Sequence, residues 1–148
     1  MPSTHLSLHY HVVFSTKNRE PWFSPSVRTK VHAYLGGAIK GQGGIAHATG
    51  GVGDHVHLLM GLKATHTLAN VMRELKAESS KWIKSEFEFA GFAWQEGYGA
   101  FTVGAPDLEQ VRSYVLNQAE HHRAKSFQAE YVGMLKRGLV EYDEAFLW

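Results

Sequence analysis

Two histidines, His55 and His57, stand one residue apart in HVHLLMGL, a stretch that otherwise reads as a buried strand. Side chains alternate between the two faces of a strand, so both imidazoles point to the same side. The other face holds Val56, Leu58 and Met60, and we expect it to lie under helices. Two neutral imidazoles make half of a divalent metal site, and a further ligand must come from elsewhere. The alternative is a half-exposed pair that only makes hydrogen bonds, because the pattern is short.

A tyrosine and a glutamine, Tyr114 and Gln118, lie four residues apart in a predicted helix over residues 107–125. Residues at this spacing share one face of a helix, here at the edge of its apolar stripe. From that edge a side chain can reach across into a cleft. The alternative is an interfacial tyrosine ring with Gln118 in solvent. The next residues, EHHR at 120–123, are predicted to be polar surface, with a role in metal binding as a minor alternative. Asp107 with Gln110 resembles a capping box at the start of the helix.

The hydrophobic periodicity predicts the elements that would position these side chains. They are a strand over 5–16, a helix from Pro25 to the glycine-rich run 40–44, two strands within 44–62 joined by a glycine turn, a helix over 65–87, short strands within 92–104, the helix over 107–125, and a short helix and tail over 127–148. This order is that of a split βαβ, or ferredoxin-like, α+β fold with an antiparallel sheet and helices on one face. The tyrosine-bearing helix is an addition near the C-terminus. We expect the face that carries the histidine pair to be open for ligands.

Composition narrows the classes of protein. The 148 residues, 44% of them hydrophobic, suit one domain over 1–148, with a core at 1–105, the tyrosine helix at 106–125 and a C-terminal part at 126–148. The absence of cysteine excludes disulfides and thiolate metal sites and favours a reducing compartment. No apolar run predicts a membrane span or a signal peptide. The net charge of +1 does not by itself indicate a nucleic-acid binder, whereas ten histidines are many for this length.

Taken together, these motifs resemble those of the single-tyrosine HUH transposases. These are small enzymes of simple bacterial insertion sequences and their relatives associated with extragenic palindromic repeats. HVHLL fits the HUH motif, and YVLNQ fits the helix with a tyrosine and a glutamine. YHVVFSTKNR, WQEGYGAFTV and YDEAFLW are similar to the family as well, so the resemblance covers nearly the whole chain.

The resemblance implies a reaction. Tyr114 would attack a phosphodiester of single-stranded DNA, giving a 5′-phosphotyrosine and a free 3′-hydroxyl that can later be rejoined. His55, His57 and Gln118 would hold one divalent ion, Mg²⁺ or Mn²⁺, that offsets charge on phosphorus. No residue is assigned as the general base for Tyr114.

The resemblance also implies partners. The DNA would carry hairpins, and the protein would be a homodimer in the bacterial cytosol, with the tyrosine helix acting in cis or completing the site of the other subunit in trans. In the second case, residues 126–131 would form a hinge. Basic side chains predicted to grip DNA are Lys17, Arg19, Arg73, Lys76, Lys81 and Arg112, although each patch could equally be a solvated face.

Other functions remain open from the sequence. One is a domesticated or relaxase-like nicking protein with the same chemistry. Another is a non-catalytic RNA-recognition-like module, for which stacking aromatics rather than imidazoles are expected on the sheet. A third is a zinc-storing or sensor protein built on the four strand histidines His9, His11, His55 and His57. A covalent protein–DNA adduct that requires Tyr114 would separate the enzymes from the binding proteins.

Overall fold

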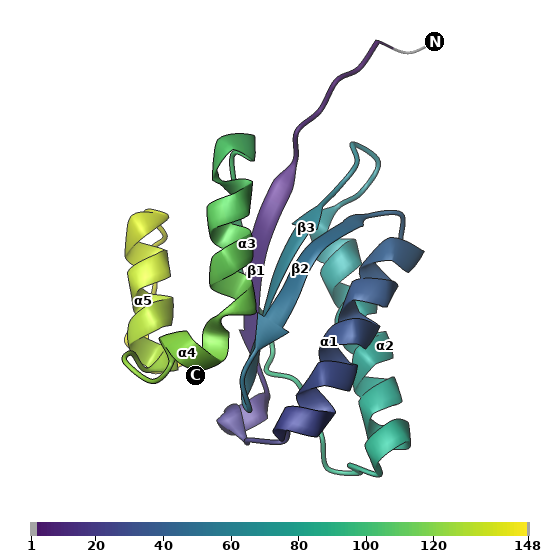
Figure 1. The fold of residues 1–148 in the computed structure, drawn as a ribbon, viewed down its shortest axis with the longest axis vertical. Helices are drawn as coiled ribbons and strands as arrows, with labels where there is room; N and C mark the ends of the chain where they lie inside the picture. Colours follow the sequence, from purple (N-terminus) through teal and green to yellow (C-terminus); the bar gives the residue numbers. More distant parts are fainter. Residues whose placement is uncertain (1–2, 148) are drawn as a thin grey trace.

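An antiparallel sheet separates two layers of helices in the computed structural model, which describes residues 3–147 (Figure 1). The four strands are β1 (His9–Ser15), β2 (Ile45–Gly51), β3 (His55–Gly61) and β4 (Gly99–Thr102), in the order β2-β3-β1-β4. Every neighbouring pair is antiparallel. The predicted α+β, ferredoxin-like fold is therefore confirmed, although the first and last strands are shorter than the sequence pattern predicts.

One face of the sheet forms the main core with α1 (Pro25–Gly41) and α2 (Leu68–Phe87). Alternation along β1 and β3 places their apolar positions on this face, where they are fully buried: Val12, Phe14, Val56, Leu58 and Met60. Pro25 at the first turn of α1 and the Thr67 side chain, which accepts a hydrogen bond from Asn70 N–H at the start of α2, mark where these helices begin. The predicted placement of Val56, Leu58 and Met60 under helices is confirmed.

The opposite face is covered as well, so the prediction of an open histidine face is wrong. It lies under α3 (Leu108–Leu116), α4 (Gln118–His121) and α5 (Phe127–Arg137), which form the second layer in Figure 1. Apolar residues on this face, among them Val13 and Leu59, pack against α3 and α5, and this burial stabilises the cover. His55 and His57 are consequently 0% exposed.

The predicted helix over 107–125 is broken in two. The first part ends at Leu116, and Asn117 has non-helical angles (φ −105°, ψ 29°) before α4 begins. The predicted capping box is also wrong, because the Asp107 side chain makes no capping hydrogen bond. Residues 126–131, expected to be a hinge if the site is completed in trans, form the start of α5, where the Ser126 hydroxyl accepts a hydrogen bond from Ala129 N–H. A hinge there stays a prediction. A turn at 122–126 connects α4 to α5.

Between residues 3 and 147, no helix combines the length and apolar character needed to cross a lipid bilayer.

A glycine sets how closely α3 approaches the sheet. Gly50 in β2 is the register partner of His57, and a Cβ at this position would lie 2.0 Å from the backbone oxygen of Val115. We therefore expect Gly50→Ala to push the end of α3 away from β2, since overpacking of this kind costs about 1–3 kcal/mol. Tyr114 precedes Val115, so its position should shift too. Chemical denaturation measures the loss of stability.

Gly37→Ala is the matched control. Gly37 lies inside α1, where a Cβ would meet nothing within 4 Å. Alanine is a better helix former than glycine by about 1 kcal/mol, so this variant should be as stable as wild type or more stable. A Gly50→Ala protein with unchanged stability would contradict the close packing of α3 on β2.

Candidate metal and nucleophile site

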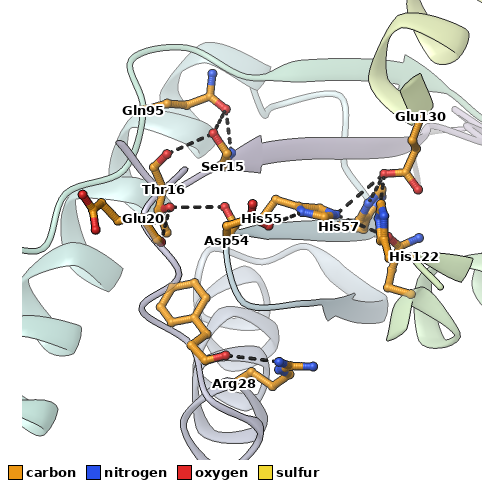
Figure 2. Close-up of polar contacts among 12 residues, drawn as sticks. Ser15, Thr16, Glu20, Arg28, Asp54, His55, His57, Gln95, His122 and Glu130 are labelled. Atoms are coloured by element: carbon orange, nitrogen blue, oxygen red, sulfur yellow. Dashed lines mark hydrogen bonds and ion pairs between the residues drawn. The ribbon is translucent and has the colours of Figure 1, made fainter. Parts of the chain in front are cut away.

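A cluster of buried side chains lies between the sheet and its second helical layer (Figure 2). His55 and His57 come from β3, His122 follows α4, and Glu130 belongs to α5. One potential ligand atom from each of these four residues lies within 4.8 Å of the other three. We call these four residues the histidine–glutamate cluster. His57 Nε2 is 3.1 Å from Glu130 Oε1, and the Nε2 atoms of His55 and His122 are 3.7 and 3.4 Å from the same oxygen.

The outer hydrogen bonds of His55 and His122 direct their other nitrogens inward. His55 Nδ1 lies 2.8 Å from Asp54 Oδ1. Burial alone would raise the pKa of Asp54, but its hydrogen bond and charge interaction with His55 lower it, so the carboxylate is ionised and accepts a hydrogen bond from Nδ1–H. His122 Nδ1 donates to the carbonyl oxygen of Lys125 at 2.7 Å. In the neutral imidazoles, Nε2 then carries a lone pair.

Gln118 adds another acceptor to the same place. Its Nε2 donates to the backbone oxygen of Tyr114, which fixes the orientation of the amide. Its Oε1 therefore points inward, 3.0 Å from His122 Nε2 and 3.4 Å from His55 Nε2. Gln118 is only 1% exposed, so the break at Asn117 has carried the amide into the interior.

This arrangement fits a bound cation. When His55 and His122 are neutral, their inward nitrogens and the oxygens of Gln118 and Glu130 are all acceptors, and acceptors do not hydrogen-bond to one another. Burial lowers the pKa of His122, which favours its neutral form. Two ligands each about 2.1 Å from one ion are about 3.0–3.5 Å apart, close to several of the separations in this cluster. Imidazole, carboxylate and amide groups are accepted ligands of divalent ions.

His57 is held by a second histidine on β1. His57 Nδ1 and His11 Nε2 are 2.8 Å apart, so one donates a hydrogen bond to the other. Burial and the neighbouring His57 lower the pKa of His11 to about 3, and burial lowers the pKa of His57 to about 4. Both are therefore neutral at physiological pH. If His57 Nε2 bonds a cation, its proton is on Nδ1 and is donated to His11 Nε2.

Tyr114 reaches the cluster from α3. Its hydroxyl donates a hydrogen bond to Glu130 Oε2, and its ring centroid lies 5.6 Å from that of His57. Burial raises the pKa of the phenol, and Glu130 raises it further through its hydrogen bond and charge. Burial alone would raise the pKa of Glu130, but hydrogen bonding and charge interaction with His57 lower it to about 2. Both shifts keep the proton on Tyr114.

The side chain of Tyr114 is also accessible from outside. It lines two pockets, one of about 580 Å³ beside β4 and the end of α5, and one of about 570 Å³ beside α4. A strand of polymer could therefore approach the phenol although the histidines beneath it are buried.

The structure thus brings together the four residues that the sequence singled out, His55, His57, Tyr114 and Gln118, within one chain. Sequence reasoning missed two members of the cluster. The assignment of residues 120–123 to polar surface is wrong for His122, which belongs to the cluster. No sequence pattern pointed to Glu130 as a ligand, because it lies in an ordinary amphipathic helix. Only the turn at 122–126 brings that helix back to the sheet.

The two remaining strand histidines do not complete a site of four. His9 lies beside His47, with Nδ1 and Nε2 3.1 Å apart. His11 contacts the outer nitrogen of His57, away from the cluster. A four-histidine zinc site on β1 and β3 is therefore not the arrangement seen.

The basic residues expected to grip DNA are spread over several surfaces. Lys17 and Arg19 lie in the short helical turn that follows β1. The charge of Arg19 adds to the larger effect of His55 in lowering the pKa of Asp54. Arg73 and Lys81 are exposed on α2, in the layer opposite the cluster, and Arg112 is partly exposed on α3.

The amine of Lys76 is engaged by two backbone oxygens within the chain. Nζ donates to the carbonyl oxygens of Gln95 and Gly97 at 2.6 and 2.7 Å, and so holds the segment before β4 against α2. A role in DNA binding stays a prediction for the whole set, and Lys76 is placed least favourably for it.

Comparisons with known proteins agree with this fold. The chain is similar to a proposed transposase from Deinococcus radiodurans R1, with 24% identity, a TM-score of 0.64, and coverage of 80% of this chain and 96% of the other. It is similar in fold to a REP-associated tyrosine transposase bound to a REP hairpin, with 12% identity, a TM-score of 0.55, and coverage of 95% and 76%. No curated protein matches. The model of the family described as IS200-like transposases matches residues 4–118, and the chain belongs to that family.

Proposed function

We propose that this transposase cleaves and rejoins single-stranded DNA through a phosphotyrosine formed by Tyr114. A divalent ion would be held by the histidine–glutamate cluster together with Gln118. The observation that carries the proposal is that Glu130 contacts both the phenol of Tyr114 and the imidazole nitrogens that point into the cluster. Its Oε2 accepts from Tyr114 O–H, while its Oε1 faces three imidazoles.

The residues of the chain have separate tasks in this reaction. Tyr114 supplies the attacking oxygen, and Glu130 Oε2 accepts the hydrogen bond from its hydroxyl. Glu130 would receive the proton only when positive charge held at the cluster offsets the raised pKa of the phenol. The phenol oxygen forms a bond to phosphorus, and the bond from phosphorus to the 3′-oxygen breaks. That oxygen takes up the proton that Tyr114 gave to Glu130 and leaves as a 3′-hydroxyl, so atoms and charge balance. Because a phenolate is a good leaving group, a 3′-hydroxyl can reverse the step and rejoin the strand.

The ion, when bound, supplies positive charge that stabilises the phenolate and the charge on the phosphorus oxygens. Three imidazoles with a carboxylate suit Mn²⁺ better than Mg²⁺, which prefers oxygen ligands. Asp54, His11 and the Lys125 carbonyl keep these imidazoles in a fixed orientation.

Access and assembly form part of the proposal. His55, His57 and Glu130 are buried between the sheet and the second helical layer, so we infer that α5 shifts when a DNA phosphate enters. The site is formed within one chain, which favours action in cis, and a homodimer is not required for its geometry. A hairpin substrate is supported by the fold similarity to the transposase bound to a REP hairpin.

A non-catalytic binding module is less favoured. Such a module would present aromatic side chains on its sheet for base stacking. Here the corresponding face carries imidazoles beneath helices.

One experiment tests the proposed function directly. Purified protein is incubated with labelled single-stranded DNA from the flanks of its own gene, with Mn²⁺, with Mg²⁺ or with a chelator. We expect a denaturant-resistant protein–DNA species that requires a divalent ion. An adduct of equal yield in the chelator would exclude the metal, and no adduct with any flanking hairpin would exclude the reaction.

A further inference from the structure

The pocket of about 580 Å³ on the outer side of Tyr114 has the composition of a small-molecule site. It lies between β4, the start of α3 and the end of α5, and we call it the β4–α5 pocket. Its volume falls in the range of about 300–1,000 Å³ typical of ligand pockets. Phe101, Val111 and Met134 line it with apolar surface, and Asp107, Gln110 and Arg137 contribute polar groups.

These polar groups are available to a ligand. Within residues 3–147, the side chains of Asp107, Gln110 and Arg137 make no hydrogen bond or ion pair, although each lines the pocket. Asp107 stands at the N-terminus of α3 without capping it, so its carboxylate has acceptor capacity left over. A cation, an amide and a carboxylate around an apolar wall can grip a molecule that is flat, aromatic and negatively charged at one end.

We propose that the β4–α5 pocket binds the base of a nucleotide adjacent to the phosphate attacked by Tyr114, and that it prefers guanine. The inference rests on the proposed function, because Tyr114, the proposed nucleophile, is itself one of the residues that line the pocket. Phe101 offers an aromatic face for stacking, and the Arg137 guanidinium suits a phosphate oxygen. The pocket would thereby select the nucleotide next to the cleavage site.

The preference for guanine follows from the acceptors and donors available. The Watson–Crick edge of guanine has two adjacent donors, N1–H and the exocyclic amine, beside the acceptor O6. The Asp107 carboxylate can accept from both donors, while the Gln110 amide, one helical turn away, can donate to O6. No other DNA base offers two adjacent donors on this edge, so a carboxylate that only accepts favours guanine.

The test measures binding of the four deoxynucleoside 5′-monophosphates to the full chain by NMR titration, without any cleavage. We expect dGMP to bind most tightly, with shifts at the amides of Phe101 and Gly138. Asp107→Asn should lower the affinity for dGMP about tenfold, a loss typical of one bidentate base contact. The affinities for the other three nucleotides should be nearly unchanged. Asparagine is as good as aspartate at a helix N-terminus, so the fold should be kept.

A second pair of variants separates the phosphate contact from general charge. Arg137→Ala should lower the affinity for all four nucleotides by a similar factor. Lys136→Ala, which removes the neighbouring charge on α5, should leave these affinities unchanged. Equal affinity for the four nucleotides, or shifts confined to other surfaces, would overturn the proposal even if a covalent adduct forms. A dGMP preference lost in Asp107→Asn, in a protein that never forms an adduct, would keep the pocket and reject the proposed reaction.

Discussion

Tyr114→Phe should abolish the covalent protein–DNA adduct while leaving metal binding in place. The change removes the proposed attacking oxygen and nothing else, so we expect a loss on the order of a thousandfold or more. The hydrogen bond from Tyr114 to Glu130 is also lost, at a cost of about 1 kcal/mol in stability. Adduct yield on a denaturing gel and Mn²⁺ affinity by calorimetry are measured on the same preparation.

Tyr34→Phe is the matched control for this variant. Tyr34 stacks on Trp82 between α1 and α2, on the opposite side of the sheet from the cluster, with ring centroids 4.4 Å apart. Its adduct yield should equal that of wild type. An adduct of normal yield in Tyr114→Phe would reject Tyr114 as the nucleophile.

His57→Ala should remove metal binding and, with it, the reaction. The substitution deletes the imidazole closest to Glu130 Oε1 and leaves His11 without its hydrogen-bond partner. Loss of groups that only orient a ligand already costs about 10–100-fold in metal affinity, so loss of a proposed ligand should cost at least as much. Mn²⁺ affinity is measured by calorimetry, and circular dichroism checks that the variant is folded.

His47→Ala is the control, because His47 is paired with His9 away from the cluster. Its Mn²⁺ affinity should be that of wild type. Unchanged affinity in a folded His57→Ala protein would remove β3 from the metal site.

Mixing the two inactive variants tests how the site is assembled. Tyr114 and His57 meet within one chain, so a mixture of Tyr114→Phe and His57→Ala proteins should form no adduct. Recovery of the adduct in the mixture would show that the tyrosine helix of one subunit completes the site of another.

The sequence predicted the frame of the molecule and four of the six residues of its site. Period-two alternation placed His55 and His57 on the face opposite Val56, Leu58 and Met60, because strand geometry leaves no other choice. The order of strands and helices along the chain indicated the sheet topology, because hydrophobic periodicity identifies each element from its own residues. The division of the chain at residues 105 and 125 stays a prediction.

The tertiary structure decided what covers the histidines. The break at Asn117 and the turn at 122–126 fold α5 back over the sheet, which buries the face expected to be open. A continuous helix over 107–125 was the natural reading, since helical periodicity passes through Asn117 without interruption. Only packing against β2, permitted by the missing side chain of Gly50, fixes where that helix ends and how its phenol is placed.

The cluster itself shows the same division. The sequence by itself singled out the two imidazoles, the phenol and the amide from their spacings, but the amide enters the cluster through the break at Asn117. His122 and Glu130 joined them through contacts between residues far apart in the chain, for which local periodicity carries no information. Local geometry is set by neighbouring residues, whereas the convergence of acceptors on one point depends on how separate elements pack.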